Sequence, residues 1–125
     1  MKEKIAILIP CLNEEAAIGK VISDFHQSIP EATIYVYDNG STDRTVEVAR
    51  TAGIEPRHEP RRGKGHVVRR MFNEVDADIY ILVDGDDTYP ANRVRDLLQP
   101  VLRGEADMVV GNRMRLETSK FRFLH

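Results

Sequence analysis

The chain has 125 residues, of which 42% are hydrophobic and 30% are charged, a composition typical of one globular domain. Its net charge of -2 gives no indication of a nucleic-acid or anionic-membrane partner, and its single cysteine, Cys11, excludes an intrachain disulfide. No apolar run approaches the roughly 18 residues that cross a bilayer. The N-terminus lacks a secretion-signal pattern, so we expect a cytoplasmic protein.

Short apolar runs and helical patterns alternate along the chain. Strands are predicted where the runs are apolar, β-branched or aromatic, at residues 5–10, 33–37, 54–58, 79–83 and 107–111. Helices are predicted where apolar residues recur at helical spacing, at residues 14–28, 42–53, 65–75 and 90–102. Ser41 or Thr42 is the predicted cap of the second helix. Alternation of this kind produces right-handed βαβ units, so we expect an α/β fold in three layers, α/β/α, with a mostly parallel sheet.

The segment from residue 112 to residue 125 has a different character. Its basic residues outnumber its acidic ones, and its apolar residues, among them Phe121 and Phe123, show no clear period. We interpret residues 1–111 as the core of the protein. Residues 112–125 are interpreted as a basic and aromatic tail that starts a further region.

Polar residues and glycines follow the predicted strands, while the strands themselves are apolar. They form short segments at residues 10–14, 38–41, 61–64 and 84–87. In an open parallel sheet, ligands bind beyond the carboxyl ends of the strands. We therefore expect these segments to converge on one binding site.

The acidic segment Asp84-Gly85-Asp86-Asp87 is the sharpest of these signals. Carboxylates crowded in this way repel one another, and they suit a hard divalent cation, Mg²⁺ or Mn²⁺, which prefers oxygen ligands. A metal at this point would bind a diphosphate and stabilise its charge. The alternative is a solvated turn in which Asp87 or Thr88 caps the next helix. The position directly after a buried strand favours the metal site.

Asp38, Asn13 and Glu14 each have two interpretations. The Asp38 carboxylate suits hydrogen bonds from a base or a ribose, but Asp38-Asn39-Gly40 would also form a local Asx turn. Asn13 would otherwise cap the first helix, with Glu14 favoured in its first turn. For these residues, ligand binding and local structure remain open.

The basic, glycine-bearing loop Arg61-Arg62-Gly63-Lys64-Gly65 leads into the third predicted helix. A helix N-terminus favours anions and glycines allow close backbone approach, so contact with a nucleotide diphosphate is one interpretation. A solvated basic loop is the other. The spacing of a P-loop is absent, and no dinucleotide-binding glycine pattern follows the first strand. Cys11 has no paired base in the sequence, and we interpret it as a small buried residue.

A set of motifs runs in order along the chain: Ile9-Pro10-Cys11-Leu12-Asn13-Glu14-Glu15, Asp38-Asn39-Gly40-Ser41-Thr42-Asp43-Arg44-Thr45, Arg62-Gly63-Lys64-Gly65, Asp84-Gly85-Asp86-Asp87 and Gly111-Asn112-Arg113. Together they resemble family 2 glycosyltransferases of the GT-A fold, the Rossmann-like fold of nucleotide-diphospho-sugar transferases. The match is closest to the polyprenyl-phosphate sugar transferases, the group that includes dolichol-phosphate mannose synthase. The motifs extend over residues 9–113, so the resemblance covers nearly the whole chain.

The resemblance implies a transferase that uses a UDP- or GDP-sugar with Mg²⁺ or Mn²⁺ and inverts the anomeric centre of the sugar. The residues implied in nucleotide binding are Pro10, Leu12, Asn13, Glu14, Asp38, Gly40, Ser41, Lys64, Gly65 and Asp84. Asp84 and Asp86 stand for the D-x-D motif of the family and would ligate the metal. Asp86 and Arg113 are the implied catalytic residues, with Arg113 near the phosphate of an acceptor such as polyprenyl phosphate.

The chain also departs from the family, whose members are usually much longer. It stops where the acceptor-binding half would begin, which leaves open a catalytically silent nucleotide-binding or assembly module. A nucleotidyltransferase is a third hypothesis, disfavoured because its early glycine-rich loop is missing. We expect an open apolar face where the other half would pack, and hence a homo-oligomer or pairing with a separate chain. A polyprenyl-phosphate acceptor would place the protein at the periphery of a membrane.

Overall fold

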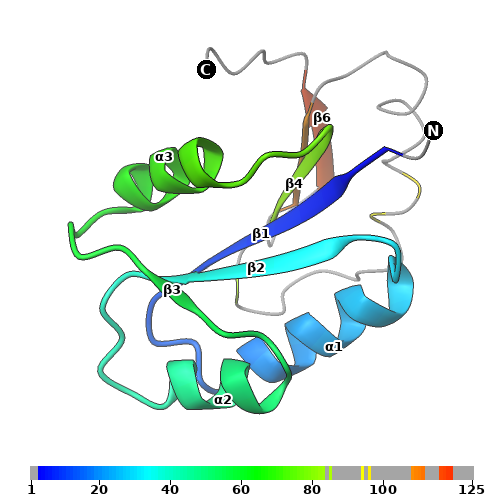
Figure 1. Cartoon of the computed structure of the whole chain (residues 1–125). Coiled ribbons are helices and arrows are strands. Elements are labelled where there is room, and N and C mark those ends of the chain that lie inside the picture. Colours follow the sequence, from blue (N-terminus) through cyan, green and yellow to red (C-terminus); the bar gives the residue numbers. More distant parts are fainter. Residues whose placement is uncertain are drawn as a thin grey trace.

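The computed structural model describes residues 3–83, 85, 94, 96, 108–111 and 116–119, which build a six-stranded sheet with helices packed on it (Figure 1). In chain order, the elements are β1 (Ile5–Cys11), α1 (Ile18–Ser28), β2 (Thr33–Asp38), α2 (Thr45–Thr51), β3 (Arg57–His58), α3 (Lys64–Glu74), β4 (Ile79–Val83), β5 (Met108–Gly111) and β6 (Leu116–Ser119). The strands lie in the order β3-β2-β1-β4-β5-β6. Neighbouring strands are parallel except for β5 and β6, which confirms the mostly parallel sheet.

β1 lies in the middle of the sheet, and its seven residues are all buried. β2 pairs with one edge of β1 from Ala6 to Cys11, and β4 pairs with the other edge from Ile5 to Leu8. A strand covered on both faces needs apolar residues at every position, which is why its sequence, IAILIPC, shows no alternation.

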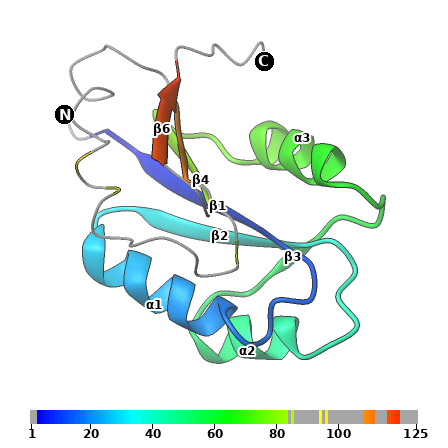
Figure 2. The same ribbon diagram turned by 180° about the vertical axis from the view of Figure 1, so that it is seen from behind.

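Helices cover both faces of the sheet, as the two opposite views show (Figures 1 and 2). α1 and α2 lie on one face, and α3 lies on the other. Successive side chains of a strand point to opposite faces. Ile7 and Ile9 therefore join the core cluster under α1, whereas Ala6 and Leu8 join the cluster under α3. The predicted three-layer α/β/α arrangement is confirmed.

Two helices begin later than the sequence predicts. α1 begins at Ile18 instead of Glu14, and α2 begins at Thr45 instead of beside Ser41 or Thr42. The residues before each helix form loops that are tied to each other by side-chain hydrogen bonds, which are described with the site. Helical spacing of apolar residues does not reveal such contacts, so both predicted starts are wrong.

The remaining boundaries agree more closely with the prediction. β4 has the predicted bounds, β1 extends one residue further to Cys11, and β2 extends one residue further to Asp38. β3 is shorter than predicted and contains Arg57–His58 alone. Most of the helix predicted at residues 90–102 lies outside the described residues, although Val94 and Asp96 are helical.

Part of the predicted tail belongs to the sheet. Leu116–Ser119 form β6, which pairs antiparallel with β5 from Gly111↔Leu116 to Met108↔Ser119. The apolar period gave no sign of this strand. The division of the chain at residue 111 stays a prediction.

The predicted open apolar face would expose large hydrophobic side chains. Among the described residues, one large hydrophobic side chain is exposed, that of Leu12 at 40%. In the same part of the chain, the helices are too short or too polar to cross a bilayer. The predicted self-association stays a prediction.

Candidate functional site

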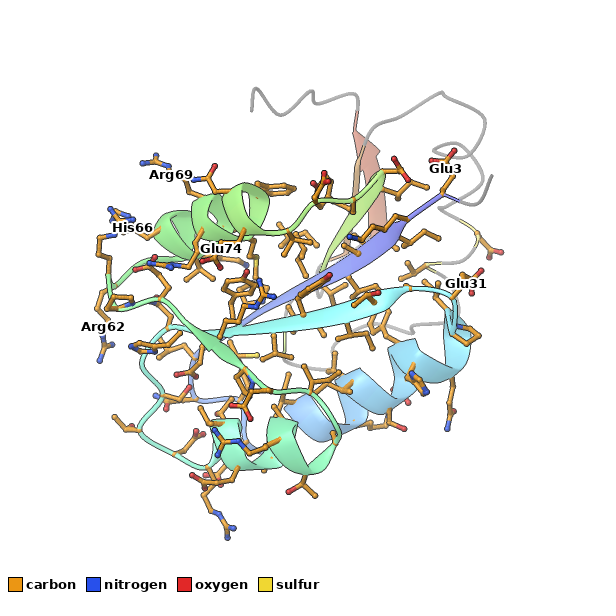
Figure 3. All side chains as sticks on the ribbon, viewed as in Figure 1. Glu3, Glu31, Arg62, His66, Arg69 and Glu74 are labelled. Carbon is orange, nitrogen blue, oxygen red and sulfur yellow. The ribbon has the colours of Figure 1, made fainter. Side chains whose placement is uncertain are left out.

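The loops that follow β1, β2, β3 and β4 meet at one end of the sheet and surround a pocket of about 460 Å³. Figure 3 shows Arg62 and His66 at this end, and Glu3 and Glu31 at the opposite end. The pocket is lined by Pro10, Cys11, Leu12, Glu14, Asn39, Arg62, Gly63, Lys64, Val67 and Gly85. The predicted convergence at the carboxyl edge therefore holds within the described residues.

The loop after β1 is tied to the loop after β2 through Asn13. The backbone of Asn13 has a positive φ of 55°, a conformation that asparagine tolerates better than most residues. Its Oδ1 accepts the N–H of Thr42 at 2.8 Å and that of Asp43 at 3.4 Å, and its own N–H donates to Ser41 Oγ at 2.9 Å. Asn13 thus joins two loops and does not cap α1, which corrects the capping interpretation.

The second loop returns these contacts to the first. Glu14 N–H donates to Thr45 Oγ1 at 2.8 Å, and Glu15 N–H donates to Asp43 Oδ2 at 3.2 Å. Asp43 Oδ1 also accepts the N–H of Thr45 at 2.9 Å, at the start of α2. Asp43, and neither Ser41 nor Thr42, is therefore the side chain that bonds the first turn of α2.

Asp38 is used inside its own turn. Its buried carboxylate accepts the N–H groups of Gly40 at 3.1 Å and Ser41 at 3.0 Å, and it also accepts the Ser41 hydroxyl. Gly40 has a φ of 94°, which suits glycine. The Asx-turn interpretation is confirmed for Asp38, which does not line the pocket, whereas the next residue, Asn39, does.

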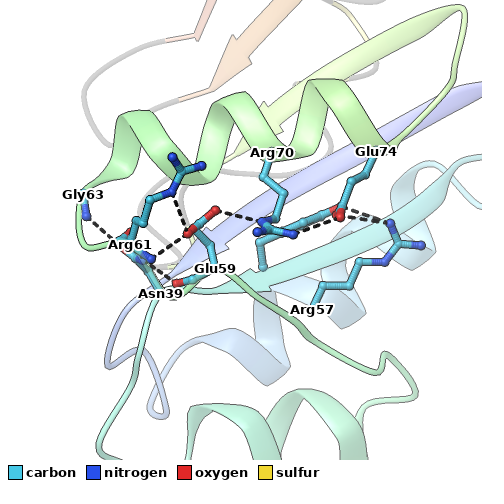
Figure 4. A network of polar contacts seen from close by, with 8 residues as sticks. Asn39, Arg57, Glu59, Arg61, Gly63, Arg70 and Glu74 are labelled. Carbon is cyan, nitrogen blue, oxygen red and sulfur yellow. Dashed lines mark hydrogen bonds and ion pairs between the residues drawn. The ribbon is translucent and has the colours of Figure 1, made fainter.

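Asn39 holds the basic loop, a role that the sequence did not reveal. Its Nδ2 donates to the carbonyl groups of Glu59 at 2.9 Å and Arg61 at 2.8 Å, and its Oδ1 accepts the N–H of Gly63 at 3.0 Å (Figure 4). Asn39 is 6% exposed and lines the pocket. In the Asp38-Asn39-Gly40 motif it is indistinguishable from an ordinary turn residue, and its partners lie about 20 residues further along the chain.

Glu59 is the second residue that the sequence did not reveal. Its side chain has no exposed surface, which is unusual for a carboxylate. Its Oε1 accepts Arg70 Nε at 2.8 Å, and its Oε2 accepts the Arg61 N–H at 2.6 Å. The Arg70 side chain and the Arg61 N–H lower the pKa of Glu59 to about 2, so this carboxyl group is charged in the folded protein at neutral pH.

The start of α3 forms the basic wall of the pocket. Gly63 is the N-cap of α3 with a φ of 124°, and no side chain caps the helix there. Arg62, Gly63 and Lys64 line the pocket next to this helix end, whereas Gly65 is exposed outside it. A helix N-terminus combined with two cationic side chains suits an anionic ligand group.

Cys11 and Gly85 bring the end of β1 against the end of β4. A Cβ atom on Gly85 would lie 2.9 Å from Cys11 Sγ, closer than carbon and sulfur pack. Burial, together with the carboxylates of Glu14, Asp38 and Asp43, raises the pKa of Cys11 far above its ordinary range. The thiol therefore stays protonated, in agreement with a buried structural role and against a nucleophilic one.

The predicted metal ligands, Asp84 and Asp86, lie outside the described residues. The described residues contain no group of three or more metal-ligating side chains. Gly85, the residue between Asp84 and Asp86, lines the pocket together with Glu14. Carboxylate oxygens of Asp84 and Asp86 would fit Mg²⁺ or Mn²⁺ by their chemistry.

The predicted binding residues divide into three groups. Those that line the pocket are Pro10, Leu12, Glu14 and Lys64. Those that lie in the same loops but do not line it are Asn13, Asp38, Gly40, Ser41 and Gly65. Asp84, Asp86 and Arg113 lie outside the described residues, so their roles stay predictions.

Comparison with known proteins places the chain in a family. Residues 6–125 match the family model described as glycosyl transferase family 2. Protein RfbJ of Shigella flexneri is 55% identical over 109 residues, which are 87% of this chain and 84% of RfbJ. The dolichyl-phosphate hexose transferase of Haloferax volcanii is 31% identical over 112 residues, which are 90% of this chain and 49% of that protein.

Solved structures show the same fold. Glucosyl-3-phosphoglycerate synthase of Mycobacterium tuberculosis matches with a TM-score of 0.74 and 30% identity, over 82% of this chain and 42% of that one. The same enzyme in complex with Mn²⁺ and UDP-glucose matches with a TM-score of 0.73, over 40% of its length. The chain thus spans about half, or less, of the length of these named transferases.

Close packing at Gly85 leads to a stability prediction. Gly85→Ala should lower the unfolding free energy by about 1–3 kcal/mol, because the added methyl group overlaps buried Cys11 Sγ. Cys11→Ala removes that sulfur, so the double variant should lose less than the sum of the two single variants. Urea denaturation of the three variants measures this. Gly65→Ala, where a Cβ meets nothing within 4 Å, is the matched control, and strict additivity would show that the contact is absent.

The ionised state of Glu59 predicts an acid-dependent stability. The pKa of the Glu59 carboxyl group is about 4.3 in the unfolded chain and about 2 in the folded chain. The folded chain therefore binds fewer protons between these two pH values. Its contribution is therefore present above about pH 4.3 and is lost as the pH falls toward 2. The difference in unfolding free energy between the wild-type chain and Glu59→Gln should be largest at neutral pH and should shrink over that range. A difference that stays constant with pH in denaturant titrations would contradict it.

Proposed function

The chain belongs to glycosyl transferase family 2, and from its pocket we propose that it binds a nucleotide-diphosphate sugar together with a divalent cation and takes part in sugar transfer. The observation that carries the proposal is the pocket at the carboxyl edge of the sheet. It combines a cationic wall, Arg62 and Lys64, with a wall formed by Glu14 and Gly85, beside the D-x-D carboxylates in sequence.

The two walls have complementary tasks in this proposal. Arg62, Lys64 and the N-terminus of α3 attract the diphosphate, because charge-assisted hydrogen bonds to phosphate are among the strongest that side chains make. Pro10 and Leu12 offer apolar surface, suited to the flat face of a base. Asp84 and Asp86 would hold Mg²⁺ or Mn²⁺, which neutralises charge on the departing nucleotide.

UDP is the nucleotide that we propose first. The solved relative at 30% identity was crystallised in complex with Mn²⁺ and UDP-glucose. A complex of that enzyme with Mg²⁺ and UDP matches the chain over 82% of its length. GDP is the natural comparator, since the described pocket residues do not by themselves select a base.

The nucleotide site is tested by calorimetric titration of UDP and GDP in the presence of Mn²⁺ and of EDTA. We expect UDP to bind with Mn²⁺, and Asp86→Asn to remove the metal-dependent part of the affinity. Lys64→Met should weaken binding by about 10- to 100-fold, the equivalent of one charged hydrogen bond. Lys4→Met, at the opposite end of β1, is the control and should bind normally. Absence of binding by both nucleotides would refute the proposal.

We further propose that the acceptor is a polyprenyl phosphate and that the sugar inverts its anomeric centre. The similarity to a dolichyl-phosphate hexose transferase supports the acceptor class. A phosphate oxygen is already a nucleophile and needs no strong base, which suits single displacement with inversion. Such an acceptor would bring a cytoplasmic protein to the periphery of a membrane.

Transfer is measured with UDP-glucose, Mn²⁺ and a short polyprenyl phosphate, followed by NMR of the product. We expect a product with the anomeric configuration opposite to that of the donor, and loss of turnover in Arg113→Ala with donor affinity unchanged. Retention of configuration would refute inversion. Turnover with glycerate phosphates but not with the lipid would refute the acceptor class.

A further inference from the structure

Two buried side chains, Asn39 and Glu59, form hydrogen bonds with the backbone of the basic loop. Residues 59–63 join β3 to α3 without regular secondary structure. They include Arg62 and are followed directly by Lys64, and both of these residues line the pocket. A loop of this kind places charges accurately only if other groups restrain its backbone. Asn39 and Glu59 supply that restraint.

Asn39 uses both donors and the acceptor of its amide on this loop. Its Nδ2 donates to the carbonyl groups of Glu59 and Arg61, at 2.9 and 2.8 Å, and its Oδ1 accepts the Gly63 N–H at 3.0 Å. Because one planar group bonds three alternate residues, it sets the direction in which the intervening Arg62 leaves the backbone.

Glu59 ties the same loop to the middle of α3. Its carboxylate accepts the Arg61 N–H at 2.6 Å and Arg70 Nε at 2.8 Å, and its own N–H donates to the carbonyl of Asp38 at 3.0 Å. Arg70 in turn donates to Glu74 Oε2 at 3.1 Å, so the contacts run along α3 (Figure 4). The loop is thereby fixed to β2 on one side and to α3 on the other.

Burial of a carboxylate costs desolvation free energy, which its ion pair often fails to recover, so stability by itself does not explain Glu59. Well-packed apolar residues often replace buried ion pairs without loss, whereas removal of one partner leaves an unpaired buried charge. Here the carboxylate lies beneath a cationic loop and occupies the Arg61 N–H and Arg70. This arrangement orients the loop backbone while Arg62 and Lys64 line the pocket.

We propose that Glu59, paired with Arg70 and assisted by Asn39, is a positioning residue for anion binding: it holds the 59–63 loop so that Arg62 and Lys64 meet the diphosphate. The inference rests on the proposed function, since the diphosphate is the ligand it names. Glu59 does not line the pocket and acts through the backbone of Arg61, while Asn39 bonds the backbone of Gly63.

The test compares variants that differ in their contact with the loop. Glu59→Gln and Arg70→Met break the pair, Arg70→Lys keeps its charge, and Glu74→Gln removes a carboxylate of the same network that bonds Tyr37 and Arg70. UDP affinity with Mn²⁺ is measured by calorimetry. Hydrogen exchange of the Arg61 and Gly63 amides is measured without ligand.

We expect Glu59→Gln and Arg70→Met to bind UDP about 10- to 100-fold more weakly, as misplacement by about 1 Å can produce. Their Arg61 and Gly63 amides should exchange faster. Arg70→Lys should recover most of the affinity, and Glu74→Gln should change neither quantity, even where it lowers the unfolding free energy. That separation distinguishes positioning from a general loss of stability.

Several outcomes would overturn the inference: normal UDP affinity in Glu59→Gln, equal weakening in Glu74→Gln, or unchanged exchange of the two amides. If Glu59→Gln does not fold, the comparison of Arg70→Met with Arg70→Lys decides. If the wild-type chain binds no nucleotide, the proposed function fails. In that case the amide exchange of the ligand-free chain still decides whether Glu59 holds the loop.

Discussion

The pairing of β1 on both of its edges is the constraint on which the rest of the structure depends. With β2 and β4 alongside and helices on both faces, β1 exposes no polar group along its length. β1 itself can meet a ligand where it ends, and parallel pairing brings the ends of β2 and β4 to the same place. The pocket is therefore a consequence of topology before any single residue of it is considered.

The loops at this edge stabilise one another. Asn13 bonds the backbone of the loop after β2, and Asp43 and Thr45 return bonds to the loop after β1. Such contacts give the N–H groups of these loops a hydrogen-bond acceptor, which they would otherwise have to find in water. Asp38, a residue of the family motif, uses its carboxylate inside its own turn in the same way.

The charged side chains near the pocket differ in burial. Glu59 is buried and paired with Arg70 beneath the loop, while Arg62 and Lys64 line the cavity. Gly85 also lines the pocket, and its lack of a side chain allows the chain just after β4 to approach Cys11 closely. The pocket lining combines the cationic Arg62 and Lys64 with the acidic Glu14, charges that suit a metal-diphosphate ligand.

The sequence by itself determined the existence of the strands β1 to β5, the three layers and the edge at which the site lies, because apolar periodicity and the polar residues after each strand are local signals. It also identified Pro10, Leu12, Glu14 and Lys64 as pocket residues through the family motifs. Only the tertiary structure decided the roles of Asn39 and Glu59, the late starts of α1 and α2, and the pairing of β6. Each of these depends on hydrogen bonds between segments far apart in the chain, and such bonds leave no period or spacing in the sequence.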